Sequence, residues 1–71
     1  MSAVKNVNGD YRIQTTGAGT TVTVASTALV IPTYTNTTAR DAAITSPTAG
    51  MIVLAGTVFY GYNGSAWVAL N

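Results

Sequence analysis

The side chains that carry most protein chemistry are scarce in this chain. It contains no cysteine and no histidine, and its acidic residues are Asp10 and Asp41. General acid–base catalysis needs a histidine or a pair of carboxylates with tuned pKa values, and the Ser and Thr hydroxyls have no histidine to activate them. Metal ions likewise find too few ligands. We therefore expect a protein that is not an enzyme and that uses no cofactor and no metal.

The basic residues are Lys5, Arg12 and Arg40, which leave a net charge of +1. Nucleic-acid binding is not expected, because three cations are too few for the basic stripe that follows a phosphate backbone. The stretch from Gly17 to Gly19 lacks the spacing and the Lys of a phosphate-binding loop, so we interpret it as a turn.

Apolar residues make up 48% of the chain and charged residues 7%, whereas a soluble monomer is designed with roughly 25–35% charge on its surface. A domain of about this length also buries only about 60% of its unfolded surface, and it usually needs additional stabilisation from disulfides, a bound metal or oligomerisation. Disulfides and metals are excluded, so we expect homo-oligomerisation. No apolar run is long enough for a membrane helix or a secretory signal. We expect synthesis in the cytoplasm and no membrane partner.

The composition, rich in Thr, Val and Tyr and poor in Leu, Glu and Lys, predicts an all-β fold. Residues 1–9 are interpreted as an extended arm, followed by a single small β domain over residues 10–71. Residues 10–33 are expected to form an antiparallel hairpin and an edge strand. Pro32 lacks a ladder donor, so the second element is an edge strand or, alternatively, a crossing between two sheets. The hydrophobic pattern places Ile13 opposite Val22 and Tyr11 opposite Val24 on one face of that hairpin, with residues 16–19 as its loop.

One short helical turn is predicted over residues 37–46. Thr38 is the expected N-cap, with Asp41 three residues later as an approximate capping box. Arg40 and Asp41 are adjacent in sequence and do not face each other on a helix, so each is expected to reach a different partner. The alternative is a solvated turn.

A three-strand meander is predicted over residues 51–71, with turns at Ala55-Gly56 and at Asn63-Gly64. A two-residue type I′ loop at Asn63-Gly64 places Tyr62 opposite Ser65 and Tyr60 opposite Trp67. Phe59, Val68 and Leu70 share the reverse face. Both faces are therefore apolar, and covering both requires a second layer. The alternative is that Tyr60 and Trp67 belong to the core of the single chain.

Aromatic residues also suggest how partners bind, because Tyr and Trp are enriched in interface hot spots. A sugar site built by ring stacking is a minor alternative, since Asn63 and Asn71 are the only nearby amides.

The stretch "PTYTNTTARDAAITSPTAGMIVL" and the closing "VFYGYNGSAWVALN" resemble a segment found in structural proteins of tailed bacteriophages, notably marine and cyanobacterial phages. The likeness covers roughly the second half of the chain. The matching positions are Tyr34, Thr35, Arg40, Asp41, Pro47, Gly50, Met51, Tyr62, Asn63, Gly64, Trp67 and Leu70.

The resemblance implies a virion structural protein that assembles as a homotrimer. A short subunit suits capsid decoration, in which a cement protein on the capsid surface binds between major capsid proteins and stabilises the head. The alternatives are a tail, baseplate or fibre accessory protein with a receptor- or partner-binding role, and a soluble scaffold absent from virions. The residues expected at the oligomer or capsid interface are Tyr34, Arg40, Asp41, Met51, Phe59, Tyr60, Tyr62, Trp67, Val68 and Leu70.

Overall fold

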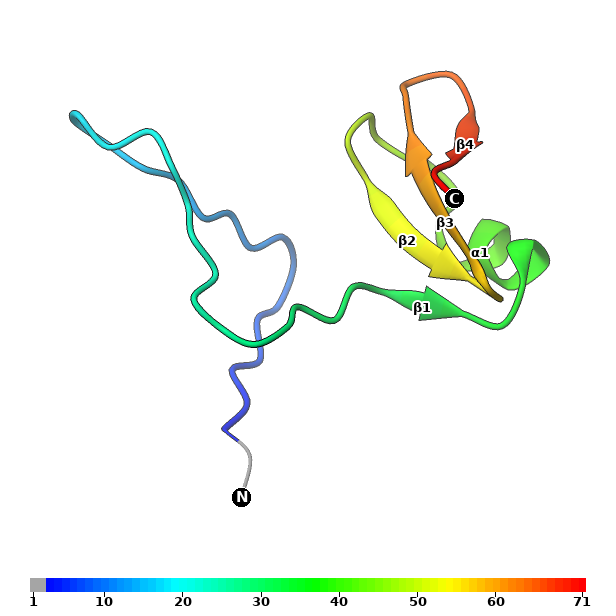
Figure 1. Cartoon of the computed structure of the whole chain (residues 1–71), viewed down its shortest axis with the longest axis horizontal. Coiled ribbons are helices and arrows are strands. Elements are labelled where there is room, and N and C mark those ends of the chain that lie inside the picture. Colours follow the sequence, from blue (N-terminus) through cyan, green and yellow to red (C-terminus); the bar gives the residue numbers. More distant parts are fainter. Residues whose placement is uncertain (1–2) are drawn as a thin grey trace.

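The helix and all strands lie between residues 33 and 69 in the computed structural model, which describes residues 3–71. They follow in the order β1 (Thr33–Tyr34), α1 (Thr37–Ala43), β2 (Ile52–Ala55), β3 (Val58–Tyr62) and β4 (Trp67–Ala69). The strands form one four-stranded sheet in the order β1-β2-β3-β4 (Figure 1). A mainly β fold with one short helix is therefore confirmed.

The sheet begins at a proline-limited edge. β1 pairs in parallel with β2, and α1 lies in the connection between them. Pro32 has no N–H to donate, but its carbonyl accepts a hydrogen bond from Leu54 N–H at 3.0 Å. β1 is an edge strand of two residues that begins directly after the proline, whereas the predicted edge strand was placed within residues 10–33.

The helix is capped by a different residue from the one expected. Asn36, not Thr38, is the N-cap, and its Oδ1 accepts a hydrogen bond from Ala39 N–H at 2.8 Å. Asn ranks with the best N-cap residues, because its side-chain oxygen satisfies a free N–H of the first turn. The helix ends at Ala43, earlier than the predicted residue 46, and Ile44 is its C-cap.

The predicted meander is formed, with shifted bounds. β2 and β3 are antiparallel, with Ala55 opposite Val58, so that the turn is Gly56-Thr57 and not the predicted Ala55-Gly56. Gly56 has a φ of +65° and donates its N–H to the Tyr34 carbonyl at 2.8 Å. A turn with positive φ at its first central position favours glycine there. That requirement fixes the turn one residue later than predicted.

The β3–β4 loop has four residues, from Asn63 to Ala66, because Tyr62 lies opposite Trp67. The predicted two-residue type I′ loop, with Tyr62 opposite Ser65 and Tyr60 opposite Trp67, is therefore wrong. Asn63 Oδ1 accepts hydrogen bonds from Ser65 N–H at 2.8 Å and Ala66 N–H at 2.9 Å. Such an Asx turn needs no positive φ at Asn63. The register moves by two residues, which leaves every side chain on its predicted face.

We call residues 3–31 the N-terminal segment. It contains no strand and no helix, and it turns at Gly17-Ala18 within the predicted loop. The hairpin predicted from residue 10 onward is therefore not formed, because a two-stranded hairpin with no layer over its apolar face is marginal in water. The division into an arm over residues 1–9 and a domain over residues 10–71 stays a prediction, and residues 1–2 lie outside the described residues.

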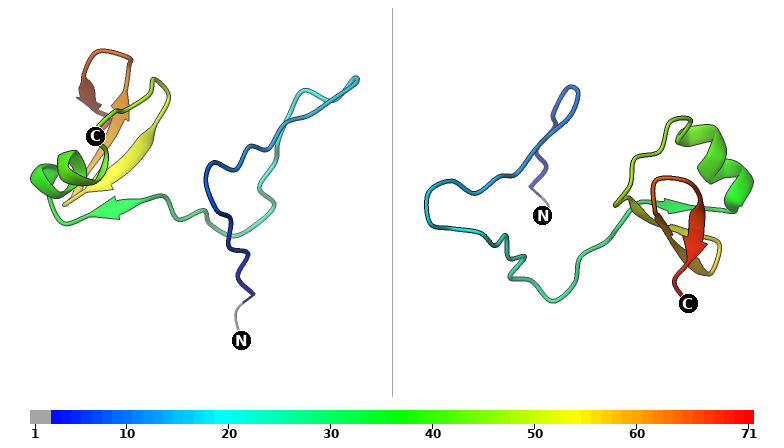
Figure 2. Two further views of the ribbon diagram at one scale, coloured as in Figure 1. Left: turned by 180° about the vertical axis from the view of Figure 1, so that it is seen from behind. Right: turned by 90° about the horizontal axis from the view of Figure 1, so that it is seen from above.

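The N-terminal segment stands away from the sheet in all three ribbon views (Figures 1 and 2). The radius of gyration is 14.5 Å, whereas a compact domain of this length has about 11 Å. Within residues 3–71, the single short helix is far from the length needed to cross a membrane.

Candidate functional site

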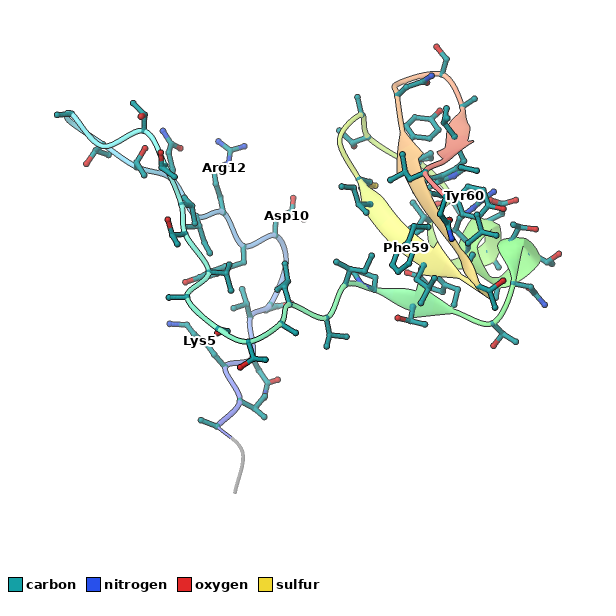
Figure 3. The ribbon with its side chains drawn as sticks, viewed as in Figure 1. Lys5, Asp10, Arg12, Phe59 and Tyr60 are labelled. Atoms are coloured by element: carbon teal, nitrogen blue, oxygen red, sulfur yellow. The ribbon has the colours of Figure 1, made fainter. Side chains whose placement is uncertain are left out.

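The two faces of the sheet differ in what covers them. Val53 and Ala55 of β2 are the buried apolar residues, and Tyr60 of β3 lies beside Val53 in register. α1 packs against this face, so we call it the helix face. Successive residues of a strand point to opposite faces, so Phe59 and Tyr60 point away from each other (Figure 3).

Arg40 of α1 is buried between two aromatic rings of the helix face. Its side chain is 9% exposed, and its guanidinium carbon lies 4.8 Å from the ring centroids of both Tyr60 and Trp67. Guanidinium groups over aromatic faces are attracted by the ring quadrupole, more strongly when water is excluded. We call Arg40, Tyr60 and Trp67 the arginine stack, which joins the helix to β3 and β4.

Strand register places a further aromatic residue, Tyr62, against Trp67 of the arginine stack. Tyr62 lies opposite Trp67, and their rings meet edge to face, with centroids 5.1 Å apart and planes at 65°. Aromatic pairs prefer this geometry to a face-to-face stack. Tyr62 therefore holds Trp67 in the orientation in which its ring receives Arg40.

Asp41 completes the surroundings of the guanidinium, against expectation. Its Oδ1 accepts hydrogen bonds from Arg40 Nε at 2.9 Å and Nη2 at 2.8 Å. The prediction that the two residues reach different partners is wrong, because the long Arg40 side chain spans the angle between neighbouring helix positions. Asp41 itself is 60% exposed, so this pair contributes little to stability.

The arginine stack is a closed structural unit. No buried side-chain nitrogen or oxygen lacks a hydrogen-bond partner among residues 3–71, and no cavity opens in this part of the chain. The same residues hold no cluster of His, Cys, Asp or Glu suited to a metal. The contacts of the Arg40 guanidinium are the Tyr60 and Trp67 rings and the Asp41 carboxylate, and they hold α1 to the sheet.

No segment within residues 3–71 forms a layer over the opposite face of the sheet, and we call it the open face. Phe59 is 41% exposed there. Leu70 lies over Gly61, with its methyl carbons 3.6 Å from where a Cβ would be. The charged residues all lie elsewhere, because Arg40 and Asp41 belong to α1 while Lys5, Asp10 and Arg12 lie on the N-terminal segment (Figure 3). The open face consists of Ile52, Leu54, Phe59, Val68 and Leu70.

Asn71 extends the edge of this face beyond β4. Its side-chain Oδ1 accepts a hydrogen bond from Phe59 N–H at 2.8 Å, and its Nδ2 donates to the Thr57 carbonyl at 3.2 Å. The amide therefore replaces a peptide group of the ladder. This use of Asn71 leaves it less suited to the sugar site considered as an alternative.

The predicted interface residues divide between the two faces. Three of them, Phe59, Val68 and Leu70, share the open face. Met51 precedes β2 and is 37% exposed. Ile52 and Leu54 were missed by sequence reasoning, although their alternation with Val53 and Ala55 is the signal that assigns them to the open face. The predicted residues associated with α1 and the helix face are Tyr34, Arg40, Asp41, Tyr60, Tyr62 and Trp67.

No family model, no curated protein and no solved structure matches this chain.

Proposed function

We propose that this chain is a structural protein of a bacteriophage virion, a capsid decoration protein that assembles as a homotrimer and binds between major capsid proteins. The observation that carries the proposal is the open face, which exposes large apolar side chains and has no charge. Apolar patches of this kind mark interaction sites on soluble proteins. The resemblance of residues 32–71 to virion proteins is the reason for proposing a virion as the assembly to which the chain belongs.

The distribution of charge supports this assignment. Arg40 and Asp41 pair with each other on α1, so neither offers a free charge for a small ionic ligand. A surface that binds through apolar area alone fits a permanent structural contact better than a transient one. Symmetric copies on a threefold axis would repeat each weak capsid contact, and the repeats multiply the affinity.

Solution mass tests the first half of the proposal. We expect light scattering to give the full chain a trimeric mass, and Phe59→Ser to lower that mass to the single chain, because it removes the largest side chain of the open face. Val4→Ser is the matched control, since Val4 is also exposed but lies at the start of the N-terminal segment. A wild-type chain that stays monomeric at high concentration would contradict self-association.

Electron microscopy of purified particles tests the second half. The expected result is density for the protein between major capsid proteins on the head surface. Density confined to the tail, the baseplate or a fibre would overturn decoration in favour of a tail-associated role. Absence from the particles would overturn both virion roles.

A further inference from the structure

The N-terminal segment carries apolar residues that no other part of residues 3–71 covers. Ile13 is 67% exposed, and it belongs to the face that the hydrophobic pattern assigns to a hairpin. Tyr11, Val22 and Val24 of the same predicted face are also exposed. The chain thus has two uncovered apolar surfaces, the open face of the sheet and this face of the segment.

The uncovered area is large for so small a protein. The chain exposes 5986 Å², whereas a compact monomer of this mass exposes about 4,200 Å². The excess is roughly 1,800 Å², and a standard protein–protein interface buries only about 800 Å² on each partner. Covering the open face and the segment together would therefore bury more than a stable complex needs.

The two surfaces are also chemically matched. The open face is without charge, and the predicted hairpin face of Tyr11, Ile13, Val22 and Val24 is equally apolar. Arg12 alternates with Tyr11 and Ile13 and would point away from that face. Pairing the two surfaces buries no charge, so the largest kind of desolvation cost does not oppose the contact.

The chain leaves the sheet in a direction that favours a neighbour over its own open face. Pro32 restricts Ile31 to extended backbone, and the N-terminal segment continues outward from β1 (Figures 1 and 2). Val30, next along the segment, is 87% exposed. Returning to the open face of the same chain would require a reversal within the few residues before β1.

We propose that residues 10–25 of one copy fold as a hairpin on the open face of a second copy, so that the subunits exchange their N-terminal segments. This deepens the proposed function and rests on its self-association, because it names what covers the open face. The hairpin that is marginal alone becomes stable when the sheet supplies its second layer. Successive exchange around a closed ring is compatible with a homotrimer.

Engineered cysteines test the exchange directly, because the natural chain has none. Single variants Ile13→Cys and Val68→Cys are co-refolded from urea, oxidised gently and digested with trypsin. Val68 belongs to the open face, and cysteine is close to valine in size, so Phe59 stays in place. A disulfide forms only where the two Cα atoms come within about 7 Å. A mixed disulfide between the peptides of the two variants is between chains by construction. Gln14→Cys is the matched control, since residue 14 lies on the opposite face of the predicted hairpin.

The expected result is a mixed disulfide from Ile13→Cys with Val68→Cys that exceeds the Gln14→Cys product with Val68→Cys severalfold. Three results would overturn the exchange: equal products from Ile13→Cys and Gln14→Cys, disulfides between two Val68→Cys chains alone, and a double Ile13→Cys/Val68→Cys chain that closes only within itself.

A second variant guards against a misfolded cysteine protein. Ile13→Asp is expected to raise the dissociation constant of the oligomer by about tenfold to a hundredfold, the effect of losing one large buried apolar side chain, while Gln14→Asp leaves it unchanged. An unchanged constant for Ile13→Asp would overturn the exchange. If these tests fail but the protein is found on virions, only the proposed exchange is overturned. If they succeed but the protein is absent from virions, only the proposed virion role is overturned.

Discussion

Val22 and Val53 both lie in alternating runs of strand-forming residues, but Val22 is 53% exposed and Val53 is 2% exposed. A glycine turn interrupts the first run and follows the second, so the two runs have similar local preferences for forming strands. The difference is that α1 covers the sheet at Val53, while no element covers the N-terminal segment. Alternation assigns side chains to faces, and a second layer decides whether the strands form.

Cation–π contacts repeat the same contrast. Lys5 Nζ lies 5.9 Å from the ring centroid of Tyr11 in the N-terminal segment, and Arg40 lies 4.8 Å from two rings in the sheet. Lys5 and Tyr11 are both exposed to water, whereas Arg40 is buried and its two rings are half-buried. Exclusion of water strengthens such contacts by about twofold or more, so only the arginine stack is expected to stabilise the fold.

The largest expected effect comes from Arg40→Ala. Two desolvated cation–π contacts of up to about 2 kcal/mol each are lost, and the removed side chain leaves space between α1 and the sheet. We expect the free energy of unfolding to fall by about 3 kcal/mol, most of the 3–5 kcal/mol that a domain this small holds. Trp67 fluorescence during urea unfolding measures it, because Trp67 is the single Trp and lies in the stack.

Two control variants accompany this measurement. Lys5→Ala removes the exposed cation–π pair of the N-terminal segment and should change the free energy of unfolding by less than about 0.5 kcal/mol. Arg40→Lys keeps the charge but loses the planar group that stacks on both rings, so an intermediate loss is expected. An Arg40→Ala protein that unfolds at the wild-type urea concentration would show that the stack does not hold α1 in place.

A smaller effect is expected from Val53→Ala, paired with Val22→Ala. Two buried methyl groups are worth about 1.6 kcal/mol in transfer alone, and an unfilled cavity adds to that. We expect a loss of about 2 kcal/mol for Val53→Ala and less than about 0.5 kcal/mol for Val22→Ala, measured by urea unfolding at dilutions where the chain is monomeric. Equal losses would mean that the N-terminal segment packs as tightly as the sheet.

Local signals in the sequence predicted much of the sheet. Pro32 marked the edge strand, and the alternation of β3 placed Phe59 and Tyr60 on opposite faces. The glycine turns located the strand ends to within a residue or two. These features depend on backbone limits of single residues, which neighbouring elements change little.

The helix N-cap and the β3–β4 loop were predicted wrongly because side-chain hydrogen bonds to the backbone, and not backbone preferences, determine them. The side chains of Asn36 and Asn63 accept hydrogen bonds from backbone N–H groups that follow them in the chain. As a result the N-cap is Asn36 and not Thr38, and the β3–β4 loop is longer than predicted. Asparagine serves as a cap, an Asx turn or a positive-φ residue, and the sequence alone does not select among these.

The arginine stack could not be predicted because its parts are far apart in the chain. Arg40 meets Tyr60 and Trp67 only when α1 crosses over the sheet, and nothing near Arg40 in sequence indicates that crossing. Its pairing with Asp41 was missed because helix spacing describes Cβ positions and not the reach of a long side chain. The N-terminal hairpin was predicted wrongly for a similar reason. Whether another element covers its apolar face cannot be read from the residues next to it in sequence.

The smallest effect is expected from Asp41→Asn, which distinguishes the contribution of the Arg40–Asp41 ion pair from that of the cation–π contacts. The substituted amide would keep an oxygen that accepts from Arg40 and would lose only the charge, and Asp41 is 60% exposed. Exposed ion pairs contribute about 0–1 kcal/mol, so we expect a loss of less than about 0.5 kcal/mol in urea unfolding at low salt. The remaining difference from wild type should shrink further at about 1 M salt, where charges are screened within about 3 Å. A loss as large as that of Arg40→Ala would instead assign the stability of the sheet to the ion pair, and the contrast between the exposed and buried cation–π contacts would no longer explain why only residues 32–71 fold within the chain.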